Sequence, residues 1–406
     1  MTVKRTEQHV IRQSHPAWKT IDDYCFRSKN LYNYTNYIAR QELIENQKRL
    51  HYYDMWQAVK DSEPYKNMGS DVGIATIRML EKAWNSFYVA IKDWKCSPQK
   101  YLGRPKLPGY RPKNGRYTLG ISNTKFKIVD GLIRFSWKPL KSLNGRFYTK
   151  IPDGAKLMQC RFVPLVSSYA MEIVYEIEVK EVSGDPVRIA AIDLGVGNFA
   201  TITNNIGLQP IVIKGGVVKA INQLYNKERA KAVSNLAIKN GKKMSKRTTA
   251  MQNKRTNRLK TQMHRYSKGV IVYCAENSID TLVCGYNPEW KQGVSLRREN
   301  NQTFTAIPHF MFIQQLEYKC QNAGIRFIKT EESYTSGTSA IDGEAPTAEN
   351  YDKSRRKHRG LFISNNGTPI NADVNGSYQI MRKVFPNALV EGIAGIACYP
   401  MSMQIA

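Results

Sequence analysis

Hydrophobic residues recur at helical spacing through two long runs in the first quarter of the chain. The runs are WKTIDDYCFRSKNLYNYTNYIARQELI and IATIRMLEKAWNSFYVAIKDW, and the second begins after Gly69 and stops before Pro98. The pattern predicts that residues 16–100 are helical. The next segment, KYLGRPKLPGYRPKNGRYT, mixes Pro and Gly with Lys and Arg and holds no acidic residue, so we expect a connection that lies on phosphates.

The hydrophobic pattern changes to short β-type runs between residues 116 and 180. YTLGI, KFKIV, LIRFSW, CRFVPLV and YAMEIVYEIEV are separated by turns rich in Asn, Gly and Ser. These runs predict a small antiparallel barrel or sheet. The first dozen residues form one more run of this type, which makes the helices of 16–100 an insertion into a β domain.

A third pattern, an alternation of strands and helices, begins after Pro186. The buried strand VRIAAIDLG is followed by NFATITNN and PIVIKG, and later by the strand TLVCG, the helix PHFMFIQQLEYKCQNAG and the strand IRFIKTEE. This order is typical of an α/β domain. Residues 333–369 are polar and interrupt the alternation, which resumes at INADVNGSYQIMRKVF.

The strongly positive charge of the chain indicates that the protein binds a polyanion. The 406 residues include 61 Lys and Arg against 33 Asp and Glu, a net charge of +28, with 42% hydrophobic residues. That apolar content excludes a disordered chain. Residues 217–268 alone hold 15 Lys and Arg against Glu228, and they predict a helical hairpin with a break at Gly241. Like charges this dense destabilise a helix unless phosphates neutralise them, so we predict contact with a nucleic-acid backbone.

The start of the chain is polar, and no run of 18 uncharged apolar residues occurs. We therefore expect a cytoplasmic protein that associates with the nucleoid. The seven cysteines are scattered without C-x-x-C spacing, which predicts buried thiols and neither a disulfide framework nor a thiolate zinc site.

Two acidic residues stand in unusual surroundings. Asp193 interrupts the apolar run IAAIDLG, where a buried carboxylate is costly unless it is paired or binds a metal. The RNase H-like fold presents a metal ligand in this way, on a central strand before a glycine turn; an Asp that caps the turn is the alternative. Asp373 stands at the start of a helix, where N-capping is the ordinary explanation. Together the two carboxylates fit a pair of Mg²⁺ ions about 3.5–4 Å apart in a nuclease.

The motif AIDLGVGNFATI resembles the first RuvC motif of the TnpB family of transposon-encoded nucleases and of their relatives, the type V CRISPR effectors. The resemblance continues in the family's order through KRTNRLKTQMHRYSKGVI, GYNPEWKQ, IPHFMFIQQLEYKCQNAGI, TEESYTS and INADVNGSYQIMRKVFPNA. It implies an RNA-guided DNA endonuclease, a Mg²⁺-dependent phosphodiesterase with a two-metal RuvC centre. Its implied partners are a guide RNA, double-stranded target DNA with a short adjacent motif read by the protein, and the RNA–DNA heteroduplex, but no membrane.

The resemblance also implies a multi-domain α+β organisation. Its expected parts are a β-barrel wedge domain (1–15 and 105–185), an inserted helical recognition domain (16–104), an RNase H-like RuvC nuclease domain (186–332 and 370–400) that contains the basic hairpin 217–268, and a target-nucleic-acid-binding insertion (333–369).

The sequence departs from the family pattern at the second acidic position. The usual glutamate ends the fourth strand of the nuclease domain, and here TLVCG ends in Gly285. Neighbouring strands lie about 4.8 Å apart, so a glutamate that ends the adjacent strand reaches the same metal. We expect the catalytic and metal-binding set Asp193, Glu332 and Asp373, with Glu331 as the alternative to Glu332. Glu289 is a third candidate, better explained as a surface residue.

A second departure concerns zinc. Many members of the family hold zinc with four cysteines in the insertion, but residues 333–369 contain no cysteine, so we expect no structural zinc. The cluster KSRRKHR, which begins at Lys353, is expected to contact nucleic acid. The full set of predicted nucleic-acid contacts is Arg104, Lys106, Arg111, Lys113, Lys242, Lys243, Lys246, Arg247, Lys254, Arg255, Arg258, Lys260, Arg265, Arg355, Arg356, Lys357 and Arg359.

The missing glutamate at position 285 leaves other functions open. The main alternative is a nuclease-dead, RNA-guided DNA-binding repressor. A DNA transposase or a structure-specific resolvase on the same fold is a third possibility, because a fold does not determine function.

Overall fold

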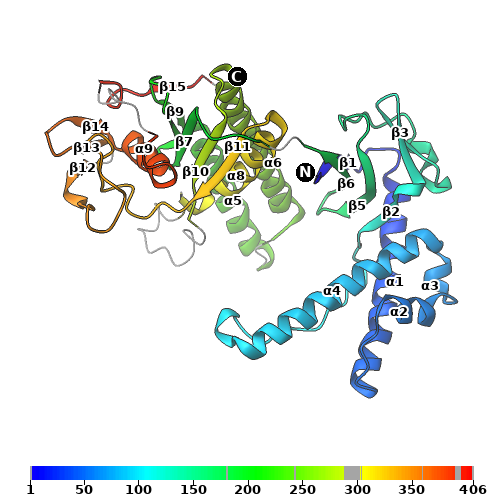
Figure 1. The fold of residues 1–406 in the computed structure, drawn as a ribbon. Helices are drawn as coiled ribbons and strands as arrows, with labels where there is room; N and C mark the ends of the chain where they lie inside the picture. The colour runs from blue at the N-terminus through cyan, green and yellow to red at the C-terminus, as the bar shows by residue number, and fades with distance from the viewer. Residues whose placement is uncertain are drawn as a thin grey trace. The chain divides into compact units, whose positions relative to one another are not determined.

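The chain folds into separate helical, antiparallel β and α/β parts (Figure 1), as the three hydrophobic patterns predict. A computed structural model describes residues 2–179, 182–241, 244–287, 302, 304–358, 360–388 and 395–404. The chain divides into two units, Thr2–Glu178 and Val179–Ala406.

The unit Thr2–Glu178 joins a helical part to an antiparallel sheet. Strand β1 (Thr2–Arg12) pairs along its whole length with β6 (Ser168–Glu178), so the first dozen residues complete the sheet as predicted. The sheet order is β1-β6-β5-β2, with β5 (Lys156–Pro164) and β2 (Leu119–Ser122), and β3 (Phe126–Val129) forms a separate hairpin with β4 (Leu132–Phe135). No pairing among the described strands joins β1 to β2, so this sheet is open and barrel closure stays a prediction.

Four helices follow β1 where helical spacing predicts them. They are α1 (Trp18–Glu45), α2 (Tyr52–Val59), α3 (Glu63–Lys66) and α4 (Ser70–Cys96). One hydrophobic core joins them to the sheet, because Leu31 and Trp84 of the helices belong to the same buried cluster as Phe162 of β5.

The unit Val179–Ala406 is built on a mixed sheet of six strands in the order β11-β10-β7-β8-β9-β15. Strands β7, β8 and β9 are antiparallel neighbours, β10 and β11 run parallel to β7, and β15 runs parallel to β9. The strands are β7 (Ile189–Leu194), β8 (Asn198–Asn204), β9 (Ile211–Lys214), β10 (Thr281–Gly285), β11 (Arg326–Thr330) and β15 (Met401–Ser402).

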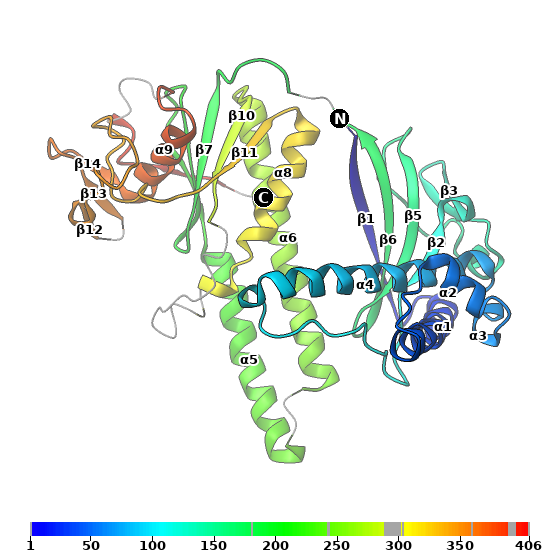
Figure 2. The same cartoon turned by 60° about the horizontal axis from the view of Figure 1, so that its bottom comes forward.

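Helices cover both faces of this sheet (Figure 2). They are α6 (Lys246–Glu276) and α8 (His309–Ala323) on one face and α9 (Ala372–Val384) on the other, whereas α5 (Gly216–Asn240) packs mainly against α6. Alternate residues of β7 face opposite sides: Ala190 and Ile192 share a core with α6 and α8, whereas Ile189 and Ala191 pack with Ile380 of α9. Asp193, the next odd-numbered residue of β7, therefore faces the same side as Ile189 and Ala191, the side of α9.

The basic hairpin and the polar insertion form as separate substructures. Gly241 ends α5 in the left-handed conformation (φ 66°), which confirms the predicted break. The insertion holds a three-stranded antiparallel sheet of β12 (Arg356–His358), β13 (Leu361–Ile363) and β14 (Pro369–Asn371), and α9 begins directly after β14.

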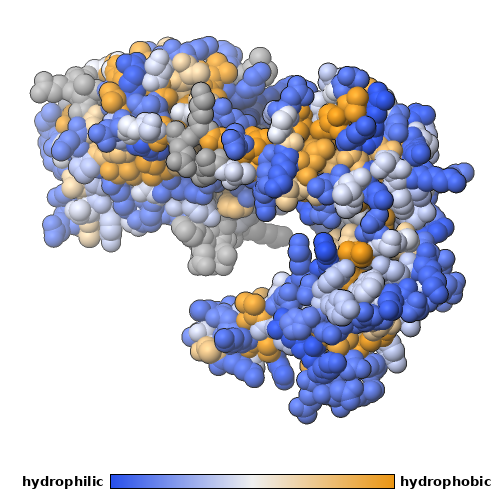
Figure 3. Space-filling view, turned by 45° about the vertical axis from the view of Figure 1, so that its right-hand side comes forward, coloured by the Kyte–Doolittle hydropathy of each residue, from blue (hydrophilic) through white to orange (hydrophobic). Residues whose placement is uncertain are grey.

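Hydrophilic residues predominate on the molecular face shown in Figure 3. No helix in the described part of the chain has the length and apolar character that crossing a membrane requires. All seven cysteines are free; five are buried, which confirms the prediction for them, but Cys96 is exposed because it ends α4. The five buried thiols are Cys25, Cys160, Cys274, Cys284 and Cys320.

Candidate nuclease site

Asp193 lies on a central strand of the sheet and faces α9. It pairs with Thr201 of β8 and follows Ile189 and Ala191 on the same face of β7. A Cβ atom on Gly376 of α9 would lie 2.9 Å from Asp193 Oδ2, so glycine at this helix position leaves room for the carboxylate. The carboxylate therefore lies between β7 and α9.

Glu332 fills the space that the missing glutamate would occupy. It follows β11 by two residues, and a Cβ atom on Gly285 would collide with its carboxylate and with Ile380. Asn287 fixes Glu332 twice: its Nδ2 donates to Glu332 Oε2 at 3.2 Å, and its Oδ1 accepts the Glu332 backbone N–H at 3.0 Å. Glycine at the end of β10 therefore leaves room for the carboxylate of Glu332, which comes from the segment after the neighbouring strand β11.

Glu331 points elsewhere. Its Oε2 lies 2.6 Å from Lys383 Nζ, and about half of its side chain is exposed. The hydrogen bond from Lys383 lowers the pKa of Glu331, whereas Glu332 has the opposite shift. Of the two alternatives, the geometry brings only Glu332 to Asp193. The third candidate, Glu289, lies outside the described residues.

Asp373 lies in the first turn of α9 without acting as its cap. The N-cap is Asn371, whose side chain accepts the backbone N–H groups of Asp373 and Val374 at 3.1 and 3.3 Å. The Asp373 carboxylate is thereby left to other contacts. Asn198 Nδ2 donates to its Oδ2 at 2.9 Å, and Arg356 Nη2 lies 3.5 Å from its Oδ1.

The three carboxylates line one cavity of about 350 Å³. Its walls are the loop after β7, the start of α9 and the segment after β11. The lining residues are Asp193, Leu194, Gly195, Val196, Gly197, Asn198, Asn287, Glu332, Thr335, Ser336, Arg356, Ala372, Asp373 and Gly376. Residues remote in the sequence therefore meet in one acidic pocket.

Burial and mutual repulsion dominate the electrostatics of this cavity. Burial raises the pKa of Asp193 well above its ordinary value, the charges of Glu332 and Asp373 raise it further, and Arg356 opposes them. Burial, with the nearby charge of Glu331, raises the pKa of Glu332 to about 7. Such shifts in a cleft mark a candidate functional site.

The carboxylates suit a hard cation by their chemistry. Glu332 Oε1 is buried and has no hydrogen-bond partner among the described residues, which leaves one oxygen available as a ligand. In the same described ranges, no three His, Cys, Asp or Glu side chains are arranged closely enough to hold an ion as they stand.

Most predicted nucleic-acid contacts are exposed, and two basic residues are held internally. The exposed residues are Arg104, Lys106, Arg111, Lys113, Lys246, Arg247, Lys254, Arg258, Lys260, Arg265 and Lys357. Arg255 donates to Asn222 Oδ1 at 2.7 Å and to the Ala306 carbonyl at 3.2 Å. Lys242, Lys243 and Arg359 lie outside the described residues.

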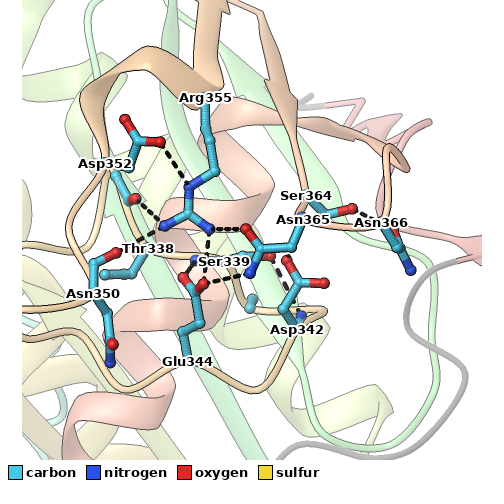
Figure 4. A network of polar contacts seen from close by, with 12 residues as sticks. Thr338, Ser339, Asp342, Glu344, Asn350, Asp352, Arg355, Ser364, Asn365 and Asn366 are labelled. Carbon is cyan, nitrogen blue, oxygen red and sulfur yellow. Dashed lines mark hydrogen bonds and ion pairs between the residues drawn. The ribbon is translucent and has the colours of Figure 1, made fainter.

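Arg355 corrects the prediction made for the KSRRKHR cluster. Its guanidinium is buried, donates to Glu344, to Asn365 and to the carbonyls of Gly337 and Asn350, and lies near Asp352 (Figure 4). We call this set the Arg355 network. A guanidinium enclosed in this way cannot contact a phosphate, whereas the adjacent Arg356 reaches the acidic cavity.

Sequence reasoning missed the two asparagines that orient the acids. Asn198 holds Asp373 and Asn287 holds Glu332, although neither stands at a position that periodicity distinguishes. The glycine at 285 was a signal only for the carboxylate that Asn287 holds: a missing side chain at a strand end indicates that a neighbouring group occupies its place.

Two family models match the chain, and both matches lie mostly within the unit Val179–Ala406. OrfB_IS605, described as a probable transposase, matches residues 172–291, and the Cas12f1-like TNB domain matches residues 309–380. The first match includes Asp193, and the second includes Glu332 and Asp373. A comparison with curated proteins found no match.

Solved structures resemble the chain over most of its length. The Cas12f1–sgRNA–target DNA complex is 14% identical with a TM-score of 0.55, covering 88% of this chain and 81% of that one. The mini-RNA-guided endonuclease CRISPR-Cas_phi3 is 10% identical with a TM-score of 0.51, covering 95% and 93%. At these identities the likeness shows a mixed α+β, multi-domain fold. With the family models, it confirms the resemblance to TnpB proteins and compact type V effectors.

Proposed function

We propose that this protein is an RNA-guided DNA endonuclease whose catalytic residues are Asp193, Glu332 and Asp373. The observation that carries the proposal is the meeting of these three carboxylates in one cavity, with Glu332 in the space left by Gly285. Burial and the charges of Glu332 and Asp373 raise the pKa of Asp193, so keeping its carboxylate charged in this cleft costs stability. A cation-dependent reaction on nucleic acid would explain why the three carboxylates lie together despite this cost.

An RNase H-like, RuvC-type nuclease domain fits the sheet of the second unit. Strand β7 has neighbours on both sides, carries Asp193 near its end and is followed by Gly195, the arrangement expected for the first acidic ligand. The helix after the polar insertion then carries Asp373. We assign residues 186–332 and 370–400 to this domain and 333–369 to a target-nucleic-acid-binding insertion.

Mg²⁺ is the cation that we propose for the site. Asp193, Glu332 and Asp373 would hold two ions, which supply the charge that activates water and stabilises the leaving oxygen in phosphodiester hydrolysis. Asn198 and Asn287 orient two of these carboxylates through their hydrogen bonds. Arg356, the positive group in the cavity wall, would contact the phosphate of the strand being cut.

The rest of the chain would bind guide RNA and target DNA. We propose that the β part (1–15 and 105–185) and the helical part (16–104) form the wedge and recognition domains, and that the hairpin 217–268 follows the heteroduplex. Its exposed basic residues predict a steep loss of binding with salt, since each phosphate contact releases a counterion. Arg355 and Arg255 are left out of this interface because of their internal contacts.

A repressor without nuclease activity is the alternative, and the site does not favour it. Its main support was the glycine at position 285, which the approach of Glu332 explains. A protein that only binds DNA gains nothing from the repulsion of three partly buried carboxylates.

The experiment is to express the full chain with its flanking genomic DNA and to sequence the RNA that co-purifies. The complex is then offered double-stranded DNA with a matched or scrambled target. We expect a defined RNA and binding and cleavage of matched DNA only, with Asp193→Ala retaining guided binding. Binding that ignores the RNA sequence, or a preparation that holds no RNA, would contradict the proposal.

A further inference from the structure

The polar insertion has few apolar side chains with which to hold its shape. Its small core consists of Ala340, Phe362 and Ile370, together with residues of α9 and Ala397. A segment of this length with so little buried apolar surface needs other interactions to offset the entropy of ordering it. The Arg355 network supplies such interactions at the centre of the insertion (Figure 4).

Arg355 joins turns that are separated in the sequence. Nη2 donates to the carbonyls of Gly337 and Asn350 at 3.0 and 2.7 Å, and Nη1 donates to Glu344 Oε1 and Asn365 Oδ1 at 2.8 and 3.0 Å. Five donors in a rigid plane allow a guanidinium to act as a multi-point cross-link that an ammonium cannot replace.

Glu344 is the counterion of this network. Its Oε2 accepts the backbone N–H of Ser339 at 2.7 Å, and its Oε1 accepts Asn365 Nδ2 at 2.8 Å. Burial alone would raise the pKa of Glu344, but the hydrogen bonds from Arg355, Ser339 and Asn365 hold it below its ordinary value. The pair is therefore charged, and both Nη atoms of Arg355 are hydrogen-bonded, whereas its buried Nε has no hydrogen bond among the described residues and lies 3.9 Å from Asp352 Oδ2.

The network is connected to the helix that carries Asp373. Gln379 Nε2 of α9 donates to the Glu344 carbonyl at 3.1 Å. The buried Asn375 of α9 accepts the Ala340 backbone N–H at 2.9 Å and donates to the Thr338 carbonyl at 2.8 Å. The turn 338–344 is thus fixed to α9 on one side and to Arg355 on the other.

The adjacent residue, Arg356, begins β12 and points toward the cavity. Its backbone pairs with Phe362 of β13, over whose ring the Arg355 guanidinium lies at 5.5 Å. Arg356 Nη2 reaches to 3.5 Å from Asp373 Oδ1. The two arginines therefore share a backbone but have opposite roles: one is enclosed, and the other borders the acidic site.

We propose that Arg355 is a positioning residue: by cross-linking the insertion to the α9 side of the site, it holds Arg356 at the acidic cavity without a metal ion. The part concerning cleavage rests on the proposed nuclease function. The cross-link itself does not, so the two are tested by separate measurements.

The cross-link is tested on the full chain by thermal unfolding and by hydrogen exchange of residues 337–365. Glu344→Gln, which leaves Arg355 without its counterion, should lower the unfolding midpoint by about 6 °C or more and speed exchange in this segment. The exposed Glu349→Gln is the matched control and should change neither. Equal behaviour of the two variants, or exchange that speeds up when EDTA is added to the wild type, would overturn the cross-link.

The positioning role is tested by a double-mutant cycle in guided cleavage. Arg355→Lys keeps the charge, so it is expected to fold, and should slow cleavage of matched DNA about 10–100-fold while guided binding is unchanged. If Arg355 acts through Arg356, the double variant Arg355→Lys/Arg356→Ala cuts no more slowly than Arg356→Ala alone. Losses that multiply would overturn this role. A wild type that binds its guide but never cuts refutes the nuclease function, whereas the hydrogen-exchange result still decides the cross-link.

Discussion

Two clusters of charged residues contact helix α9. In the Arg355 network opposite charges are paired, whereas in the acidic cavity like charges lie together. In the Arg355 network, the guanidinium meets carbonyls and carboxylates on nearly every donor. In the cavity, Asp193 and Glu332 keep a raised pKa, and Glu332 Oε1 is buried without a partner in the described chain. Opposite charges that neutralise each other build structure, whereas like charges gathered in a cleft indicate chemistry with a ligand.

The largest effect is expected when the charge of one carboxylate of the cavity is removed. Asp193→Asn should lower cleavage about 1,000-fold or more, because it removes a carboxylate that would hold the Mg²⁺ ions, and these ions would stabilise the developing charge. The same change relieves repulsion with Glu332 and Asp373, so stability should stay equal or rise. Single-turnover cleavage and thermal unfolding measure the two effects. A variant that loses activity and stability together would mean that Asp193 is a structural residue.

The adjacent residues Glu331 and Glu332 allow a glutamate in an ion pair to be compared directly with a glutamate in the cavity. Glu332→Gln should slow cleavage about 100-fold or more. Its matched control, Glu331→Gln, removes the partly exposed ion pair with Lys383 and a charge that raises the pKa of Glu332, and should cost about 0–1 kcal/mol of stability with little effect on rate. Rates are compared at saturating guide and target. Full activity in Glu332→Gln would remove it from the site.

The raised pKa of Glu332 should make the stability of the protein depend on pH. Because the folded pKa of Glu332 is about 7 against an ordinary 4.5, the folded protein holds this proton more tightly than the unfolded chain. The metal-free protein should therefore lose stability as the pH rises through this interval, by roughly 3 kcal/mol from Glu332. Denaturant unfolding at about pH 5 and about pH 8 measures the loss. Glu332→Gln should flatten the profile, and an unchanged slope in that variant would assign the effect to other groups.

The smallest effect concerns the space beside Glu332. Gly285→Ala introduces a Cβ atom that collides with the Glu332 carboxylate and Ile380, and overpacking of this kind costs about 1–3 kcal/mol. Gly216→Ala, which has open space around it, is the matched control. Thermal unfolding and cleavage should both fall for Gly285→Ala alone. If Gly285→Ala behaves like the control, Glu332 does not occupy this space.

Periodicity and misplaced charge predicted much of the fold and of the site. The interruption of the apolar run IAAIDLG was enough to single out Asp193 as a candidate metal ligand, and helical spacing was enough to locate α1, α4 and α9. The choice between Glu331 and Glu332 required three-dimensional structure, because β11 ends before both and the chain turns there.

The division of labour between Arg355 and Arg356 was hidden for a similar reason. In KSRRKHR every residue is polar, so no hydrophobic pattern shows which side chain faces inward. Only the pairing of β12 with β13 and the contact with Phe362 separate the two. Likewise, Asn371 and Asp373 are both good N-caps, and only the backbone geometry selects Asn371.

The most direct test of the account is cleavage of matched double-stranded DNA by the guide-loaded wild type, measured with Mg²⁺ and again with EDTA in excess. The account predicts guide-dependent cutting that EDTA abolishes and Mg²⁺ restores, while DNA binding persists in both conditions. Tight guided binding with no cut at any Mg²⁺ concentration would contradict it and would make the uncompensated carboxylates of the cavity a feature without catalytic use.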